Sequence, residues 1–486
     1  MTANRQLTEA APTPADRDGG VNVVGFFRAE FGQGEAARRL LAAVERAGVP
    51  FVAITQGDVP HRQEHPFPHE SSGPVYGTNI LCLNAEHLLT FVHGPDRAVL
   101  DGRYSVGIWF WETSRFARFL KPAFDYVDEL WVASTFVAEA LGAETVKPVL
   151  TFPLPVEVPP PPELTRTDVG LPEDRLVFLF LFDFWSTMER KNPLGLVEAF
   201  TRAFAPGEGP LLYIKSINGD RMPEQLAELE AAARSHPDIR VVDGFVPADH
   251  VRALTALSDC YVSLHRSEGF GLTIAEAMAY GKPAIATRYS GNLTFMEPEN
   301  SYLVGYQTTT VPEGCPPYPV GAMWADPDLD EAARHMRTVF DHPAEARARG
   351  LRGQQTIRER HSIEQTAAFL AERIPAVEHL RRVRVEDEAR TPAQGAKQFL
   401  VQGPSLPWDV PSPRFGRLGV FARRLLLRLL RPYLVRQREW ETLVADALLE
   451  AELMNRQHRE RIEKLEALLE EALDVRRRGY RAGRGR

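Results

Sequence analysis

Runs of hydrophobic residues alternate with amphipathic stretches along most of this chain, and the alternation predicts a parallel α/β fold. The longest run, residues 176–182, is continuously apolar, which is typical of a strand buried on both faces of a parallel sheet. The amphipathic stretches predict helices that cover such sheets. The pattern places strands near residues 21–26, 49–54, 79–83, 104–110, 176–182, 211–216, 239–247, 260–264, 283–286 and 302–304, and helices near 36–47, 273–280, 330–340 and 362–383.

The same pattern divides the chain into two domains with flanking segments. At 486 residues the chain is too long for a single core. Prolines crowd residues 153–162, and such a stiff, extended run cannot lie inside a sheet, so it marks the crossing between the domains. We predict α/β domains at residues 20–155 and 165–385, a disordered N-terminus at 1–19, a linker at 386–413, helices at 414–476 and a disordered tail at 477–486.

One stretch of the second domain concentrates the candidate chemistry. After the strand near 260–264, glycines flank Phe270, and a short helix is expected from Thr273 to Gly281. Glycine suits the left-handed position that follows a helix, so the helix should end there. A glycine-rich turn before a helix presents unpaired N–H groups and the positive end of the helix dipole, and proteins hold phosphates in such places.

Two glutamates, Glu268 and Glu276, lie in this stretch. Glu276 follows Thr273 by three residues, so one interpretation is the second half of a capping box, and Glu268 has an alternative interpretation as an ordinary surface acid. Together they favour a ligand site, because carboxylates beside an anion-binding turn need neutral partners. Sugar hydroxyls are suitable partners for such strong acceptors. Amides for a diphosphate and acids for hydroxyls predict a nucleotide-sugar site.

The stretch also resembles the signature of retaining glycosyltransferases of family 4, the glycosyl transferases group 1, which have the GT-B fold. The resemblance rests on the two glutamates with seven residues between them, on the Gly-Phe-Gly after the first, and on the Ala-Met-Ala-x-Gly-x-Pro after the second. It implies two Rossmann-like domains facing a cleft and covers about residues 20–385. It further implies that Glu268 lies beside the donor sugar, that Glu276 binds the ribose, and that the turn at Phe270, Gly271 and Leu272 holds the diphosphate and sugar.

In this family an Arg and a Lys near the first strand of the second domain grip the diphosphate. Lys191 matches the Lys by its distance to the Glu-Ala-Phe at 198–200. The Arg has no match, because Asp183 to Ser186 lie at the positions where the family carries it. Arg190, or a hydrogen bond from Ser186, is the expected substitute. A fixed cation is useful because the diphosphate gains negative charge as the glycosidic bond breaks. A solvated Arg-Lys pair is the alternative interpretation.

The first domain contributes a glycine-rich segment with Gly32 and Gly34. Its spacing to Ala37 is similar to a dinucleotide fingerprint, but six residues separate it from the preceding strand, whereas the fingerprint follows its strand directly. It resembles the N-terminal loop of the glycosyltransferase family, which faces the donor, so Gly32 and Gly34 are site candidates. A flexible connection is the alternative.

Aromatic side chains mark further candidates. Trp111 and Glu112 follow the strand near 104–110, at the edge where α/β proteins bind ligands, and aromatic faces pack against sugar rings. They are candidates for contact with the acceptor or donor sugar, and core packing is the alternative. Family members carry a His near this strand end, and this sequence has none there. Phe245 is expected either to stack on the nucleotide base or to pack in the core.

Composition and charge narrow the class of protein. Hydrophobic residues make up 44% and charged residues 25%, and the three cysteines show no metal spacing. This argues for a reducing compartment and against a disulfide framework. No apolar leader lies in residues 1–19 and no apolar run of 18 residues exists, so we expect a cytoplasmic protein without a spanning helix. The net charge is −8, but residues 411–486 hold 18 basic and 11 acidic residues.

This acidic body with a basic tail argues against nucleic-acid binding and fits an anionic membrane surface. Residues 417–435 alternate Arg with Leu and Phe at helical spacing, so they predict an amphipathic helix that lies on a membrane or packs on protein. Residues 440–473 are helical in pattern and carry a short coiled-coil-like face, which suggests self-association.

These features together predict a retaining, hexosyl-type glycosyltransferase. It would move a sugar from a nucleotide diphospho-sugar to a glycan or lipid-linked acceptor, in polysaccharide or glycoconjugate assembly, in the cytoplasm or at the inner face of the membrane. Glu268 and Lys191 are the expected catalytic residues. No cofactor or metal is expected, because no Asp-x-Asp motif appears at the place where a metal would be wanted. The alternatives are a non-catalytic binding or scaffold protein and a nucleotide-sugar epimerase on the same fold.

Overall fold

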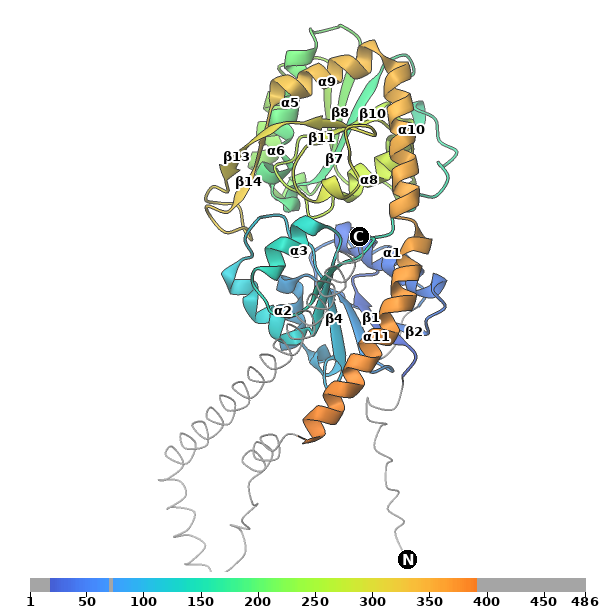
Figure 1. Cartoon of the computed structure of the whole chain (residues 1–486). Coiled ribbons are helices and arrows are strands. Elements are labelled where there is room, and N and C mark those ends of the chain that lie inside the picture. The colour runs from blue at the N-terminus through green and yellow to red at the C-terminus, as the bar shows by residue number, and fades with distance from the viewer. Residues whose placement is uncertain (1–17, 70–72, 391–486) are drawn as a thin grey trace, which may run out of the picture. The chain divides into compact units, whose positions relative to one another are not determined.

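The computed structural model describes residues 18–69 and 73–390, and within them two parallel sheets of six strands each organise the chain (Figure 1). The first sheet has the strand order β2-β1-β3-β4-β5-β6, and every adjacent pair is parallel. Its strands are β1 (Val21–Gly25), β2 (Phe51–Thr55), β3 (Thr78–Cys82), β4 (Tyr104–Ile108), β5 (Glu129–Val132) and β6 (Val149–Thr151).

Helices cover both faces of this first sheet. Val23 faces the apolar cluster that includes α1 (Gly32–Arg46), whereas the next residue, Val24, faces the cluster that includes α2 (Ala85–His93) and α3 (Thr135–Gly142). Alternate residues of a strand point to opposite faces. Burial on both sides therefore explains why apolar residues predominate in the strands of this sheet.

The second sheet has the order β12-β11-β10-β7-β8-β9 and is also entirely parallel. Its strands are β7 (Val177–Asp183), β8 (Leu211–Ile217), β9 (Ile239–Asp243), β10 (Cys260–Ser263), β11 (Ala284–Thr287) and β12 (Tyr302–Val304). Its helices are α4 (Met188–Lys191), α5 (Pro193–Ala203), α6 (Pro223–Ala233), α7 (Ala248–Leu257), α8 (Leu272–Ala279), α9 (Leu329–Asp341) and α10 (Pro343–Arg360). The predicted pair of Rossmann-like domains is confirmed.

The boundaries of two predicted elements were wrong. Helix α1 begins at Gly32 rather than at Ala36, so the glycine-rich segment is the first helical turn and not a loop ahead of it. Strand β9 ends at Asp243, because Gly244 takes a φ of +115° that ends the extended backbone before Pro247.

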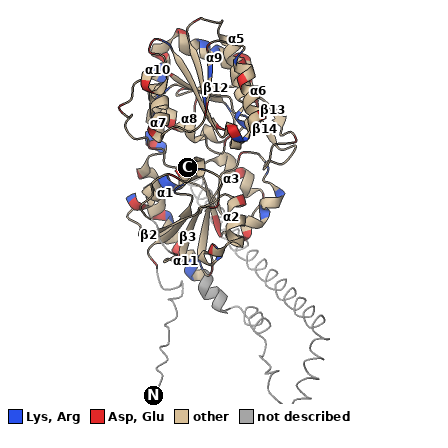
Figure 2. Cartoon of the chain, turned by 180° about the vertical axis from the view of Figure 1, so that it is seen from behind, with Lys and Arg blue, Asp and Glu red and all other residues tan. Residues whose placement is uncertain are grey.

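Acidic and basic residues are interspersed along the described helices (Figure 2). Among the described residues no helix is long and apolar enough to cross a membrane.

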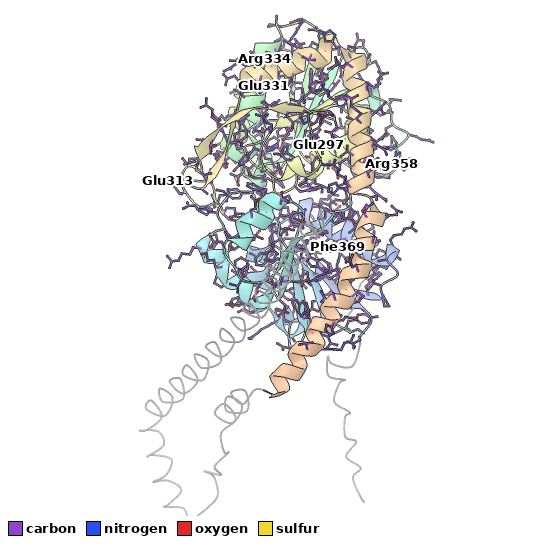
Figure 3. All side chains as sticks on the ribbon, in the orientation of Figure 1. Glu297, Glu313, Glu331, Arg334, Arg358 and Phe369 are labelled. Carbon is purple, nitrogen blue, oxygen red and sulfur yellow. The ribbon has the colours of Figure 1, made fainter. Side chains whose placement is uncertain are left out.

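Helix α11 (Ile363–Arg390) returns from the second domain to the first. Phe369 lies on this helix (Figure 3). Its ring packs edge-on against Trp131 at a centroid distance of 5.1 Å. Arg373 binds the fully buried carboxylate of Glu129 through two nitrogens, one of them 3.1 Å from Oε1. The helix extends into the segment predicted to be a linker. The predicted helices at 414–476 and the tail lie outside the described residues.

A two-stranded arm, residues 305–328, was not predicted. It contains β13 (Tyr306–Thr310) and β14 (Met323–Pro327), which pair antiparallel. Although it belongs to the second domain in sequence, five of its residues join the apolar cluster of the first domain that contains Trp109 and Phe116. These residues are Val311, Cys315, Tyr318, Ala322 and Trp324. The connecting loop is rich in proline and glycine, so its sequence carried no periodic signal of this packing.

Candidate active site

The signature stretch forms the predicted strand, turn and helix. Strand β10 ends at Ser263, the turn follows, and α8 begins at Leu272. Gly271 is the N-cap residue with a φ of +91°, a conformation that residues with a Cβ rarely adopt. The first N–H groups of α8 have no partner within the helix. The turn therefore presents amide donors next to Glu268, as the sequence predicted.

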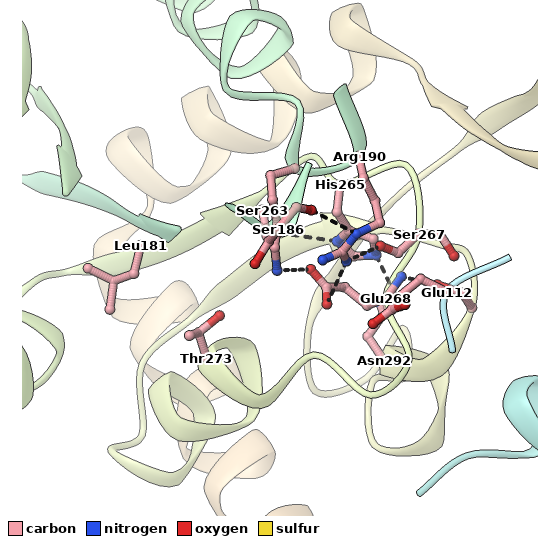
Figure 4. A network of polar contacts seen from close by, with 12 residues as sticks. Glu112, Leu181, Ser186, Arg190, Ser263, His265, Ser267, Glu268, Thr273 and Asn292 are labelled. Carbon is pink, nitrogen blue, oxygen red and sulfur yellow. Dashed lines mark hydrogen bonds and ion pairs between the residues drawn. The ribbon is translucent and has the colours of Figure 1, made fainter. Parts of the chain in front are cut away.

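Two cations hold Glu268. Lys191 Nζ lies 2.6 Å from Oε1 of Glu268, and Arg190 Nη1 lies 3.2 Å from Oε2, so each carboxylate oxygen has its own cation (Figure 4). Burial alone would raise the pKa of Glu268, but the charges of Lys191 and Arg190 offset it and bring the pKa to about 2. Glu268 is therefore ionised at neutral pH. Burial lowers the pKa of Lys191, and Glu268 opposes that shift.

A left-handed asparagine places these cations. Asn192, with a φ of 54°, separates the single turn of α4 from α5, and its Oδ1 accepts from the N–H of Gly195 at 3.3 Å. Its Nδ2 donates to the carbonyl of Leu264 at 2.9 Å, which joins this turn to the end of β10. Arg190 is 4% exposed and donates to the carbonyls of Ser267 and Ser186. The solvated Arg-Lys pair is therefore excluded.

Residues 290–292 support the turn from the side. Ser290 Oγ accepts from the N–H of Glu268 at 2.8 Å, and the backbone of Ser290 has a φ of 74°. A Cβ on Gly291 would lie 2.2 Å from the carbonyl oxygen of Gly269, so only glycine fits there. Ser134 of the first domain donates to that same carbonyl oxygen at 2.7 Å. The turn is therefore fixed by both domains.

Glu276 does not form a capping box, because its carboxylate turns toward the first domain. Its Oε1 lies 2.5 Å from Nη2 of Arg39 on α1, and Arg39 Nε also lies 2.7 Å from Oε1 of Glu35. Burial raises the pKa of Glu276, and Arg39 counteracts the shift. Thr273 bonds instead with the hydroxyl of Tyr261 at 2.8 Å. The capping alternative is wrong, whereas the ribose role stays a prediction.

The two glycines of α1 differ in their surroundings. A Cβ on Gly34 would lie 2.3 Å from the carbonyl oxygen of Ala29 and 2.8 Å from that of Phe26, so close packing requires glycine there. A Cβ on Gly32 would meet nothing within 4 Å. Gly32 is exposed at the start of the helix, where its N–H is free of intrahelical bonds. Gly32 is thus the better placed of the two to face a ligand.

Glu112 lies beside the cation pair, and Trp111 lies in the core. The hydroxyl of Tyr318 donates to Glu112 Oε2 at 3.1 Å, and burial raises the pKa of Glu112 while Arg190 opposes the shift. The indole of Trp111 is 3% exposed and packs on Phe116 and Tyr318. This burial favours the packing interpretation of Trp111 over contact with a sugar.

Two further phenylalanine candidates behave oppositely. The ring of Phe270 is buried against Phe295 and His361, so only its backbone is left to serve a ligand. Phe245 is 42% exposed, which excludes the core-packing alternative, and Arg62 of the first domain lies over its ring at 5.8 Å.

The sequence missed three site residues: Arg39, Ser134 and Tyr318. Arg39 lies one helical turn after Glu35, which is a signal only of an ordinary intrahelical ion pair. Ser134 has a recognisable role as the N-cap of α3, where its hydroxyl accepts from Val137 N. Neither pattern indicates the contact with the opposite domain, and Tyr318 lies in a loop without a motif.

Ser186 does not replace the missing Arg, because its hydroxyl does not contact Glu268. Its carbonyl oxygen accepts a hydrogen bond from Arg190 Nε at 3.2 Å. The neighbouring Asp183 accepts from Trp185 N at 2.9 Å and from Asn218 Nδ2 at 2.8 Å, so it shapes the end of β7. Of the two predicted substitutes, Arg190 is therefore the residue that joins Lys191 at Glu268.

Comparison with known proteins agrees with this geometry. Residues 176–311 match the family model described as glycosyl transferases group 1. A stretch of 127 residues is 31% identical to an N-acetyl-alpha-D-glucosaminyl L-malate synthase of Bacillus anthracis. That match covers 26% of this chain and 31% of the relative, so the chain spans about a third of the length of the curated relative it matches.

Solved structures with the same fold have low sequence identity. A sucrose-phosphate synthase of Thermosynechococcus elongatus aligns over 75% of this chain and 100% of its own, with a TM-score of 0.55 and 15% identity. Anabaena HepE, solved with UDP and glucose, aligns over 74% of this chain and 100% of its own, with a TM-score of 0.52 and 13% identity. The chain therefore has the GT-B fold, and residues 176–311 of its second domain are similar to the glycosyl transferases group 1.

Proposed function

We propose that this protein is a retaining glycosyltransferase that moves a sugar from a nucleotide diphospho-sugar to an acceptor hydroxyl. The observation that carries the proposal is the Glu268 carboxylate, held between Lys191 and Arg190 at the amide-presenting turn before α8. Such a turn is a ready anion site, and the two cations next to it suit a diphosphate. The second-domain match to group 1 glycosyltransferases supports the same conclusion.

In this proposal Lys191, Arg190 and the turn amides hold the diphosphate, rather than a metal ion. The leaving diphosphate gains negative charge as the glycosidic bond breaks, and cations fixed beforehand stabilise that charge without reorganisation. Lys191, Arg190 and Glu268 together carry a net charge of about +1, since one carboxylate faces two cations. The remaining positive charge is available to the phosphates.

Glu268 itself is a poor candidate for a general base. A base works best when its pKa lies near the working pH, and the pKa of Glu268 is about 2. We propose that it accepts hydrogen bonds from donor-sugar hydroxyls and keeps Lys191 in place. The acceptor proton would then pass to the departing phosphate, so the retaining reaction needs no carboxylate base on the protein.

The donor class is tested by binding and hydrolysis of UDP-, GDP- and ADP-sugars with purified full-length protein, next to Glu268→Gln and Lys191→Ala. We expect one donor class to bind and to hydrolyse slowly in the parent, with at least a hundredfold slower turnover in both variants. Binding of no donor by the parent would refute the proposal and leave the scaffold alternative. Turnover that inverts the configuration at one carbon of the donor sugar, without transfer of the sugar, would instead indicate the epimerase.

We further propose that the acceptor is a glycan or a lipid-linked sugar and that the reaction belongs to polysaccharide or glycoconjugate assembly. The fold likeness to HepE, which was solved with UDP and glucose, supports a UDP-sugar as the first donor to try. The proposed membrane contact through 417–435 and self-association through 440–473 lie outside the described residues. Vesicle flotation of the full chain, with and without anionic lipid, tests the membrane contact.

A further inference from the structure

Arg39 of the first domain reaches Glu276, the carboxylate that the family resemblance implies as the ribose ligand. It lies on α1, two turns after the glycine-rich start of that helix, and its Nη2 contacts Glu276 Oε1 at 2.5 Å on α8 of the second domain. Its Nε contacts Glu35 at 2.7 Å. The guanidinium is thus fixed at two of its three nitrogens and spans the boundary between the domains.

The third nitrogen of Arg39 has no partner in the described part of the chain. Nη1 is buried and forms no hydrogen bond to any residue that the structure describes. A buried charged donor without an acceptor is costly, because it loses its hydration and gains nothing in return. The neighbouring Arg38 shows the contrast, since its Nη1 donates to the carbonyls of Phe27 and Ala29 at 2.9 and 3.0 Å.

We propose that Arg39 is a nucleotide-binding residue contributed by the opposite domain, and that its Nη1 takes a phosphate oxygen of the donor. The inference rests on the proposed function, because it uses Glu276 as the ribose ligand. The ribose and the phosphates of the donor are covalently linked. A guanidinium that contacts the ribose-binding carboxylate therefore lies close to the phosphates. An unpaired guanidinium N–H suits a phosphate oxygen better than a neutral hydroxyl.

The charges around Arg39 give the proposal a second, independent test. Glu35 contacts both Arg39 and Arg38. Burial would raise the pKa of Glu35, but the charges of the two arginines outweigh burial and lower this pKa to about 2. Glu35 is therefore ionised and cancels part of the positive charge of Arg39. If Arg39 binds phosphate, neutralising Glu35 should favour binding, whereas a merely structural role predicts a loss.

The experiment measures the dissociation constants of UDP and uridine for full-length parent, Arg39→Gln, Arg39→Lys, Glu35→Gln and Lys191→Ala. We expect Arg39→Gln to weaken UDP binding at least tenfold, about 1.4 kcal/mol, and uridine binding less than threefold. Arg39→Lys should keep part of the UDP affinity, and Glu35→Gln should equal or exceed the parent. Arg46→Gln is the matched control, because Arg46 is on the same helix but exposed and pairs with Glu364.

Three results would overturn the inference. They are UDP affinity in Arg39→Gln within twofold of the parent, equal losses for UDP and uridine, and a loss in Glu35→Gln as large as that in Arg39→Gln. When Lys191→Ala loses UDP and Arg39→Gln does not, the inference fails and the proposed function stands. If the parent binds none of UDP, GDP and ADP, both the inference and the proposed function are refuted.

Discussion

The hydroxyl of Tyr318 lies 3.1 Å from Oε2 of Glu112, and this contact joins the arm of the second domain to the end of β4 in the first. Two further contacts tie the same segments together: Arg115 Nη2 donates to Val320 O at 3.1 Å and Met323 N donates to Ser114 Oγ at 3.3 Å. The arm therefore closes one side of the Glu268 site, next to Arg190, whose guanidinium lies 5.9 Å from the Tyr318 ring.

Removing the Tyr318 hydroxyl should loosen this closure without dismantling the fold. Tyr318→Phe keeps the aromatic packing on Trp111 but deprives the buried Glu112 of its donor, so we expect a loss of about 1 kcal/mol in the free energy of unfolding. We also expect a higher ratio of donor hydrolysis to transfer, because water enters more easily. Urea unfolding and product analysis measure the two effects, and an unchanged ratio would refute the closing role.

Replacing Glu268 should change how stability depends on pH. Its pKa in the folded protein, about 2, lies below the unfolded value of 4.5, so its ion pairs stabilise the fold above pH 4.5 and that contribution disappears as the pH falls toward 2. The stability difference between parent and Glu268→Gln should therefore be large at pH 7 and shrink below pH 4.5. Chemical denaturation at pH 7, 4.5 and 3.5 tests this, and a constant difference would contradict it.

Breaking the ion pair between α11 and the first sheet should be costly. Glu129 is fully buried and accepts from Tyr104 at 3.0 Å and Trp131 at 2.6 Å in addition to Arg373. Arg373→Met leaves a buried carboxylate without its cation, so we expect a loss of about 3–5 kcal/mol.

Calorimetry of Arg373→Met should then show a clear drop in Tm. The exposed pair of Arg46 and Glu364 provides the control, since Arg46→Gln should cost less than about 1 kcal/mol. Equal effects of the two substitutions would show that the buried pair contributes no more than a surface pair.

The two glycines of α1 should respond oppositely to alanine. Gly34→Ala places a Cβ 2.3 Å from a backbone oxygen, so the start of the helix must shift, and we expect a loss of 2 kcal/mol or more in stability, about the cost of overpacking a core. Gly32→Ala meets open space and should leave stability within about 0.5 kcal/mol of the parent.

Donor binding separates the roles of these glycines. If the start of α1 faces the donor, Gly32→Ala should weaken UDP binding several-fold while the Tm stays unchanged. Titration calorimetry and thermal melts of the same preparations give both numbers. Unchanged UDP affinity in Gly32→Ala would exclude Gly32 from the site.

Much of the fold was predictable because its signals are local. The apolar runs mark the strands, since a parallel sheet buried on both faces admits few polar residues there. The glycines around Phe270 and the two glutamates locate the turn before α8, because φ and helix-end requirements restrict the residue types at neighbouring positions. The match of Lys191 rests on its spacing to α5, which is also local.

The tertiary structure alone decided which groups that are distant in the sequence meet. Lys191 and Arg190 converge on Glu268 within the second domain from 77 and 78 positions away, whereas Arg39 reaches Glu276 from 237 and Tyr318 reaches Glu112 from 206 across the domains. Such contacts depend on how the two sheets and the arm pack, and no spacing in the sequence encodes them. The capping box at Glu276 was wrong for this reason: a buried guanidinium from another domain is a stronger partner for the carboxylate than a backbone N–H of its own helix.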